Sequence, residues 1–254
     1  MLTPQYAKLF SSMPLRRLLS YFGLALYIWP CLLLASCQAN STAPMPAKPS
    51  LTYLALGDSY TIGHDVEEAD RWSVQLVAML NAAAQPSSSP IAQPQIIATT
   101  GWTTAELSEG IDAAADTNHY SMVSLLIGVN NQYRGQPTTT YRSEFAALLA
   151  RARGYARGRA DKVFVLSIPD WGVTPAGASR DRAQVAAEID AYNAVAKEEC
   201  ARVGIAFINI TPTSRLAASE PKYIASDDLH FSGLMYKKWA EIAFPTVQAL
   251  LAKP

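Results

Sequence analysis

The chain has 254 residues, half of them hydrophobic, with 21 basic and 21 acidic side chains and a formal net charge of zero. This size and composition predict one globular domain with an extension, and the balanced charge gives no support for nucleic-acid binding. Of the three cysteines, only Cys200 lies beyond residue 37, so a disulfide framework is excluded and Cys200 is expected to be a small core residue.

Residues 1–36 have the layout of an export signal. Three basic residues precede an apolar run over residues 18–35, and no acidic residue occurs before Asp58. The run ends in the sequence LASC, which resembles the bacterial lipobox and implies cleavage before Cys37 and lipidation of its thiol. We therefore predict an exported lipoprotein anchored in a membrane of the bacterial cell envelope. An uncleaved membrane anchor and a soluble secreted product remain the alternatives, and Met13 is an alternative start.

Residues 37–50 are rich in Pro, Ala and Ser. This composition predicts a flexible tether that lets the domain stand away from the membrane. The folded domain is then expected to occupy residues 51–254.

The domain begins with the sequence LTYLALGDSYT at residues 51–61. Its apolar run predicts a buried strand that ends at Gly57 and delivers Ser59 to the start of a helix. In open α/β sheets ligands bind at the carboxyl ends of the strands, so Ser59 is a candidate nucleophile. A simple helix-capping turn, with Asp58 or Ser59 as the cap, is the structural alternative.

Strands and helices alternate through the rest of the chain. Strands are expected over residues 95–99, 122–129, 162–169 and 205–210, and helices over 71–84, 103–115, 141–152, 185–203 and 232–251. Ser232 is expected to cap the last helix, and Pro245 to kink it. The alternation predicts a three-layer α/β/α sandwich with a parallel sheet of about five strands, flavodoxin-like in the broad sense.

Two further strand ends carry groups that can donate hydrogen bonds. Gly101 follows the strand over residues 95–99, and its backbone N–H is a candidate donor to an oxyanion. Asn130 follows the strand over residues 122–129, and its side-chain amide is a second candidate. All of these groups are expected at the same edge of the sheet as Ser59.

Near the C-terminus, Asp227 stands three residues before His230. On a turn or the first coil of a helix this spacing brings both side chains to one face, so the carboxylate can hold the imidazole through its Nδ1–H. The other ring nitrogen is then free to take a proton from Ser59, as in a Ser-His-Asp triad. Asp228 leaves a second carboxylate nearby as an alternative partner.

Taken together, the blocks at residues 57–61, 101, 128–131 and 227–230 resemble the SGNH hydrolase family, also called GDSL esterases and lipases. The resemblance implies Ser59 as nucleophile, Gly101 and Asn130 as oxyanion donors, His230 as general base and Asp227 as its orienting partner. The chain departs from the family at Asn131, where Asp is more common, and at Asp228, where Gly is common. The larger α/β-hydrolase fold is disfavoured, because its Gly-x-Ser-x-Gly turn would need glycine at Thr61.

The remaining histidines are predicted to lie outside the catalytic machinery. His64 follows the nucleophile closely enough to line the cleft, whereas His119 is expected on the surface at the opposite end of the sheet. No two histidines have metal-ligand spacing, so neither a metal nor a cofactor is predicted.

The predicted activity is hydrolysis of carboxylic esters, and lysophospholipids, acetylated polysaccharides and short-chain esters all remain candidate substrates. The alternative is a surface lipoprotein that binds glycan or lipid without turnover.

Overall fold

A five-stranded sheet forms the centre of the computed structural model, which describes residues 50–253. Its strands are β1 (Tyr53–Gly57), β2 (Gln95–Ala98), β3 (Met122–Leu126), β4 (Val163–Leu166) and β5 (Ala206–Ile208). All neighbouring pairs are parallel, in the order β2-β1-β3-β4-β5. Every residue of β1, β3 and β4 is buried, which explains their continuous apolar runs.

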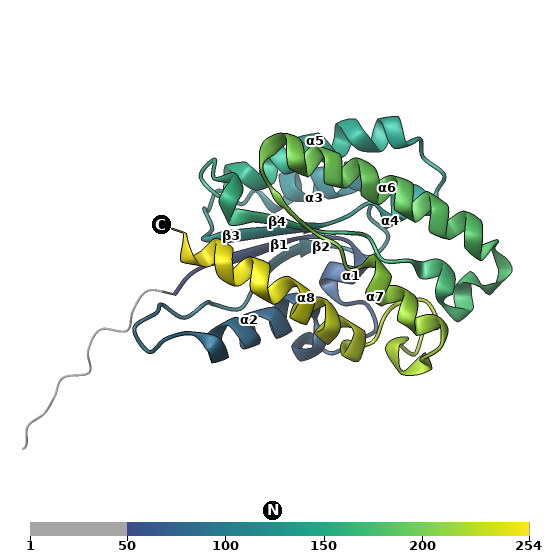
Figure 1. Ribbon diagram of the computed structural model, residues 1–254. Coiled ribbons are helices and arrows are strands. Elements are labelled where there is room, and N and C mark those ends of the chain that lie inside the picture. Colours follow the sequence, from purple (N-terminus) through teal and green to yellow (C-terminus); the bar gives the residue numbers. More distant parts are fainter. Residues whose placement is uncertain (1–49, 254) are drawn as a thin grey trace, which may run out of the picture. The chain divides into compact units, whose positions relative to one another are not determined.

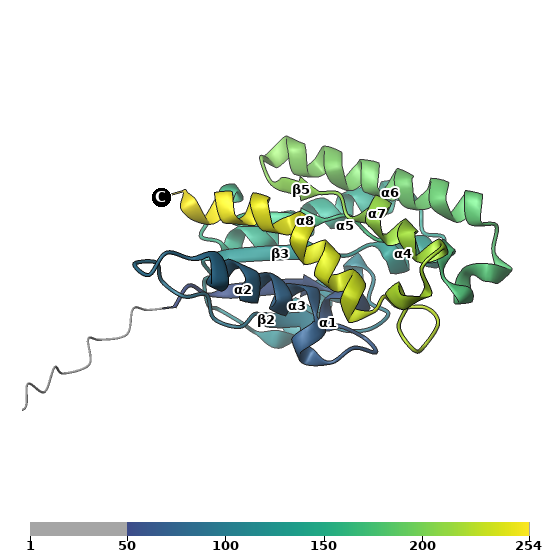
Figure 2. The same ribbon diagram turned by 60° about the horizontal axis from the view of Figure 1, so that its bottom comes forward.

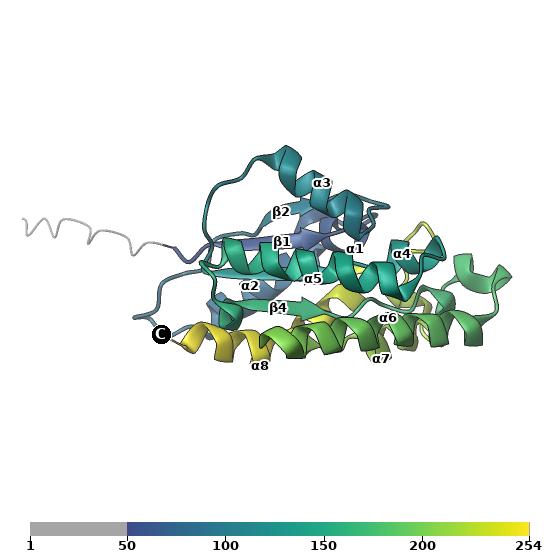
Figure 3. The ribbon, with the colours of Figure 1, turned by 90° about the horizontal axis from the view of Figure 1, so that it is seen from above.

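Helices cover both faces of this sheet. The helices α3 (Thr104–Ala114), α5 (Thr138–Tyr155) and α6 (Arg182–Val203) lie on one face, and α2 (Trp72–Ala83) and α8 (Gly233–Ala252) lie on the other (Figures 1 and 2). The view from above shows α5 and α6 running along the strands (Figure 3). The predicted three-layer α/β/α sandwich is therefore confirmed.

Three short helices follow strands directly and gather at one edge of the sheet (Figure 1). They are α1 (Ser59–Ile62) after β1, α4 (Val129–Tyr133) after β3, and α7 (Thr211–Ser214) after β5. Single turns of 3-10 helix complete the connections, at Glu68–Asp70, Ala160–Lys162, Trp171–Val173, Pro175–Ser179, Arg215–Ala218 and Pro221–Tyr223.

The observed elements differ from the predicted ones mainly at their ends. The strand expected over residues 122–129 ends at Leu126, because Val129 already begins α4. Ser232 occupies the N-cap position of α8, but its hydroxyl donates to the Lys222 carbonyl and makes no capping bond. The helix α8 continues through Pro245 to Ala252.

The predicted core position of Cys200 is confirmed, since its side chain is fully buried. The predictions for the export signal, for Cys37 and for most of the tether fall on residues 1–49, outside the described residues. Within residues 50–253, no helix combines the length and the hydrophobicity that crossing a membrane requires.

Candidate active site

The strand order of the sheet changes direction between β1 and β3. The chain leaves β1 toward β2 on one side and then crosses to β3 on the other, so the strand order reverses at β1. Crevices at such reversals, outside the carboxyl ends of the strands, are where α/β sheets bind ligands. Ser59 follows β1 and Asn130 follows β3, so both lie at this point.

The nucleophile turn, residues 57–63, is built by close packing of the backbone. A Cβ atom on Gly57 would lie 2.1 Å from the Thr61 hydroxyl and 2.5 Å from the Leu126 carbonyl, so only glycine fits. Asp58 caps α1 by accepting a hydrogen bond from the Tyr60 N–H at 3.0 Å. Ser59 is thereby fixed as the first residue of α1, where its N–H has no partner within the helix.

Asp58 is buried beneath this turn. Burial raises the pKa of its carboxyl to about 7. Among the described residues, its Oδ2 atom has no hydrogen-bond partner. The nucleophile turn therefore contains a carboxyl group whose charged form is disfavoured by its surroundings.

The histidine loop, residues 224–231, holds its imidazole by hydrogen bonds to one carboxylate. Asp227 Oδ2 lies 2.5 Å from His230 Nδ1. Asp227 Oδ1 accepts the backbone N–H groups of Leu229 and His230 at 3.0 and 2.8 Å, so the carboxylate is fixed as well. Asp227, rather than Asp228, therefore contacts the imidazole.

Asp228 has a different part in the same loop. Its backbone φ of 62° is left-handed, a conformation that glycine adopts freely and aspartate tolerates. Its carbonyl accepts a hydrogen bond from the Ala176 N–H. This conformation gives a physical reason why glycine suits the position in the family that the sequence resembles.

His230 is almost buried, with 6% of its surface exposed. Burial lowers its pKa, and the Asp227 carboxylate opposes that effect, so the ring is neutral at neutral pH and able to accept a proton. The ring packs edge-on against Tyr60, with 5.5 Å between the ring centroids, and this contact joins the histidine loop to the nucleophile turn. Within residues 50–253, no hydrogen bond links the Ser59 hydroxyl to His230; catalytic hydrogen bonds are often long before substrate binds.

The two predicted oxyanion donors come from segments that are bonded to each other. The Asn130 amide donates to the Trp102 carbonyl at 3.0 Å, which leaves its second N–H free to point elsewhere. The Gly101 carbonyl accepts from the Arg134 guanidinium at 2.6 Å, and Arg134 is held in turn by Glu106 at 3.0 Å. Gly101 has a φ of 88°, so the turn that carries its N–H requires glycine.

Asn131 has a structural role that the sequence did not reveal. It is fully buried, its Oδ1 accepts the Thr104 N–H, and its Nδ2 donates to the Thr104 hydroxyl and to the Gln136 side chain. A carboxylate cannot donate those two bonds, which explains why an amide suits this position. Asn131 thereby clamps α4 to the start of α3.

Two other polar side chains lie at opposite ends of the sheet, since Asp170 follows β4 and His119 precedes β3. Asp170 is buried and forms an ion pair with Arg215 at 2.8 Å, so it supports the loop after β4. His119 is exposed, as the sequence predicts.

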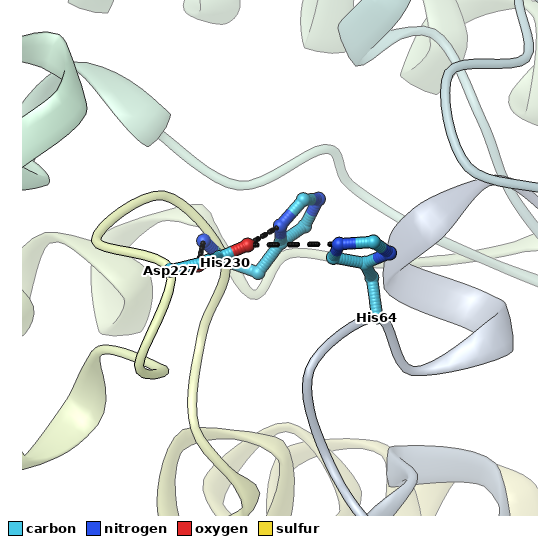
Figure 4. A group of neighbouring side chains, drawn as sticks. All are labelled: His64, Asp227 and His230. Carbon is cyan, nitrogen blue, oxygen red and sulfur yellow. Dashed lines mark hydrogen bonds and ion pairs between the residues drawn. The ribbon is translucent and has the colours of Figure 1, made fainter.

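His64 lies much closer to Asp227 and His230 than its position in the sequence indicated. Its ring centroid is 4.6 Å from that of His230, and its Nε2 atom is 3.9 Å from Asp227 Oδ2 (Figure 4). The donor atoms of His64, Asp227 and His230 all lie within 4.8 Å of one another, a grouping that can hold a metal ion. Histidine spacing could not reveal this cluster, because the loop after α1 must fold against the histidine loop to form it.

Comparison with known proteins adds a family match. Residues 55–238 match the model of the GDSL-like Lipase/Acylhydrolase family. No curated protein matches the chain.

Solved structures share the fold at low sequence identity. TesA has a TM-score of 0.61 and 17% identity, with 78% of this chain and 99% of TesA covered. The psychrotrophic esterase EstA from Pseudoalteromonas sp. has a TM-score of 0.59 and 14% identity, covering 80% and 100% of the two chains. The acetylxylan esterase Axe2 from Geobacillus stearothermophilus has a TM-score of 0.57 and 14% identity, covering 83% and 98%.

Proposed function

The chain belongs to the GDSL-like lipase/acylhydrolase family, and from that premise we propose that it is a serine esterase that cleaves carboxylic esters through an acyl-enzyme. The observation that carries this proposal is the bond between Asp227 and His230, on a loop packed against the turn that presents Ser59. A hydrolase needs an oriented, neutral histidine beside a serine, and these residues supply both.

In the proposed reaction, His230 Nε2 takes the proton of the Ser59 hydroxyl as the oxygen attacks the acyl carbon. Asp227 keeps the other ring nitrogen protonated and stabilises the imidazolium that forms. The alcohol leaves with the proton from His230. Water then repeats the sequence on the acyl-enzyme and releases the acid.

The negative charge on the acyl oxygen would be held by three donors. These are the N–H groups of Ser59 and Gly101 and the side-chain amide of Asn130. Fixed donors of this kind act mainly on the charge that develops in the transition state. Arg134 supports them indirectly, because its bond to the Gly101 carbonyl fixes the Gly101–Trp102 peptide, which is next to the peptide that carries the Gly101 N–H.

The proposed substrates are esters with a small acyl group or a single acyl chain. Short-chain acyl esters, acetylated polysaccharides and lysophospholipids fall in this class. The name of EstA supports ester hydrolysis in general, and that of Axe2, an acetylxylan esterase, supports acetylated polysaccharides. Tyr133, three residues after Asn130, is 55% exposed and packs against Trp171, so it is a candidate aromatic contact for substrate.

We further propose that the enzyme is exported and held at a membrane by a lipid on Cys37. The sequence at residues 34–37 and the apolar run before it support this localisation. Cys37→Ser is expected to leave an unprocessed precursor and to prevent incorporation of labelled palmitate. Palmitate on the variant protein would rule out Cys37 as the lipidated residue.

The test of function is hydrolysis of p-nitrophenyl esters of increasing acyl length by the full-length protein. Ser59→Ala is expected to abolish turnover and covalent labelling by a fluorophosphonate. Ser88→Ala is the matched control, because Ser88 is exposed on the loop after α2 and should leave both unchanged. Labelling that persists in Ser59→Ala would mean that another serine is the nucleophile, and no turnover on any ester would favour a binding protein.

A further inference from the structure

We propose that His64, Asp227 and His230 form a binding site for a divalent transition-metal ion of the zinc class, and that the bound ion switches the esterase off. Two imidazoles lie side by side, with ring centroids 4.6 Å apart, and each has a nitrogen directed at the same carboxylate oxygen (Figure 4). Imidazole nitrogen and carboxylate oxygen are ligands that Zn²⁺ and Co²⁺ both accept. The inhibition rests on the proposed function, whereas the binding does not.

The distances fit an ion after small side-chain movements. In a tetrahedral zinc site with bonds of 2.0–2.1 Å, neighbouring donor atoms lie about 3.3 Å apart. The separation between His64 Nε2 and Asp227 Oδ2 is 3.9 Å, slightly longer than this. The separation between His230 Nδ1 and Asp227 Oδ2 is 2.5 Å, which is shorter than this, as expected for a hydrogen bond that the ion would replace.

The surroundings already orient two of the ligands. His64 Nδ1 lies 3.0 Å from the Thr100 hydroxyl, and when this nitrogen donates its proton to Thr100, the lone pair of Nε2 faces Asp227. Such a bond on the second ring nitrogen is the usual support of a metal-binding histidine. Backbone N–H groups hold the other Asp227 oxygen, so Oδ2 remains directed at both rings.

The site is open to solvent and has a favourable charge. The His64 side chain is 45% exposed, which gives an ion a route in and leaves a position for water as a fourth ligand. A second carboxylate, Asp65, is hydrogen-bonded to the Asp227 N–H at 3.0 Å and adds negative potential beside the cluster.

Binding would stop catalysis through the tautomer of His230. An ion on Nδ1 replaces the proton that this nitrogen carries in the triad. The neutral imidazole then has its proton on Nε2, the atom that must accept the Ser59 proton, so the serine cannot be activated. Release of the ion restores the Nδ1–H bond to Asp227, so Nε2 can again accept the Ser59 proton.

The experiment is a zinc titration of p-nitrophenyl acetate hydrolysis by the full-length protein, with reversal by EDTA. The rate of each variant is expressed relative to its own rate without zinc. On this scale, His64→Gln is expected to need a higher zinc concentration for half-inhibition. Loss of a direct ligand should cost at least as much as loss of an outer partner, roughly 10- to 100-fold in affinity. His119→Gln is the matched control, because this histidine is exposed and lies outside the cluster, and it should leave the half-inhibition concentration unchanged.

Binding is measured separately by the visible absorption of Co²⁺ added to the Ser59→Ala protein, which requires no turnover. The spectrum of a bound ion is expected there and should weaken when His64→Gln or His64→Phe is added, with folding checked by circular dichroism. An equal Co²⁺ spectrum with and without the His64 imidazole would overturn the site. Equal zinc inhibition of the parent and His64→Gln would overturn the switch, whereas a protein that binds Co²⁺ through His64 but hydrolyses no ester would retain the site and refute the esterase.

Discussion

The nucleophile turn and the histidine loop present the two halves of one site, but different forces hold them. In the nucleophile turn, Ser59 is 4% exposed, and the contacts of Gly57 with Thr61 and Leu126 leave no room for a side chain. The histidine loop is exposed at residues 226–228, and hydrogen bonds to Asp227 fix it. We therefore expect changes in the first region to affect folding as well as rate, and changes in the second to affect rate alone.

Asp227→Asn should have the largest effect on rate. The amide cannot stabilise the imidazolium and favours the wrong tautomer of His230, so turnover should fall roughly 10⁴-fold. Measurement of turnover and thermal midpoint on one preparation checks this, and the midpoint should change little. Asp228→Asn is the control, because the Asp228 side chain has no bond to His230; a similar loss of rate there would contradict the assignment of Asp227.

Asn130→Ala should reduce the maximal rate roughly 10²- to 10³-fold with little change in KM, because an oxyanion donor acts mainly in the transition state. Asn130 also bonds to the Trp102 carbonyl, so its loss should lower the thermal midpoint modestly. A variant that melts early but keeps a near-normal rate per folded molecule would remove Asn130 from the oxyanion hole.

Gly57→Ala tests the packing of the nucleophile turn. The added methyl group would meet Thr61 and the Leu126 carbonyl, and such overpacking costs about 1–3 kcal/mol of the free energy of unfolding. Denaturant unfolding and turnover should both report a loss. Gly154→Ala is the control, because an added Cβ there meets no atom within 4 Å and alanine favours the helix α5. Equal stability of the two variants would contradict this account of the turn.

Asp65→Ala tests the connection between the two regions. Asp65 Oδ2 accepts from the Ser226 hydroxyl at 2.6 Å and from the Asp227 N–H at 3.0 Å, so it ties the loop after α1 to the histidine loop. Loss of these bonds should lower kcat/KM roughly tenfold, the effect of about one hydrogen bond to a charged group. Asp65→Asn keeps an acceptor and tolerates the left-handed φ of 61°, and it should retain most of the rate.

The rate and the stability should depend on pH in different ways, because the rate reports His230 in the histidine loop and the stability reports Asp58 in the nucleophile turn. Since burial lowers the pKa of His230, the rate should fall on the acid side only below the ordinary pH range of histidine. Asp58, in contrast, makes the free energy of unfolding depend on pH, because burial raises its pKa. Its pKa of about 7 in the folded protein lies above the value in the unfolded chain. The stability that the protonated carboxyl contributes is therefore complete at low pH and is lost as the pH rises through 7. Asp58→Asn should flatten the stability profile between pH 4 and 7 and leave the acid limb of the rate in place.

The fold could be predicted because local patterns determine it. Buried parallel strands give continuous apolar runs, and the helices between them show a period of 3.6 residues. Strand ends were less predictable, because the apolar run of β3 passes directly into α4, and composition does not show where pairing with β1 stops.

The candidate site also has a part that the sequence could predict and a part that it could not. The three-residue spacing between Asp227 and His230 encodes a local contact, so the sequence could indicate it. The approach of His64 to this pair depends on how two distant loops fold against each other, and no local spacing encodes that. The catalytic roles of Ser59, Gly101 and Asn130 stay predictions, and the variants of Ser59 and Asn130 test two of them.

The aromatic cluster behind the site has a consequence for the order in which the protein matures. Tyr60, made early, packs against Phe231 and Trp239, made late, with centroids 5.8 and 6.0 Å apart. A growing chain therefore contains Ser59 long before it contains His230 or the aromatic rings that pack against the nucleophile turn. A product interrupted before His230 lacks the proposed base, and one interrupted before α8 lacks the helix that covers the same face of the sheet as α2.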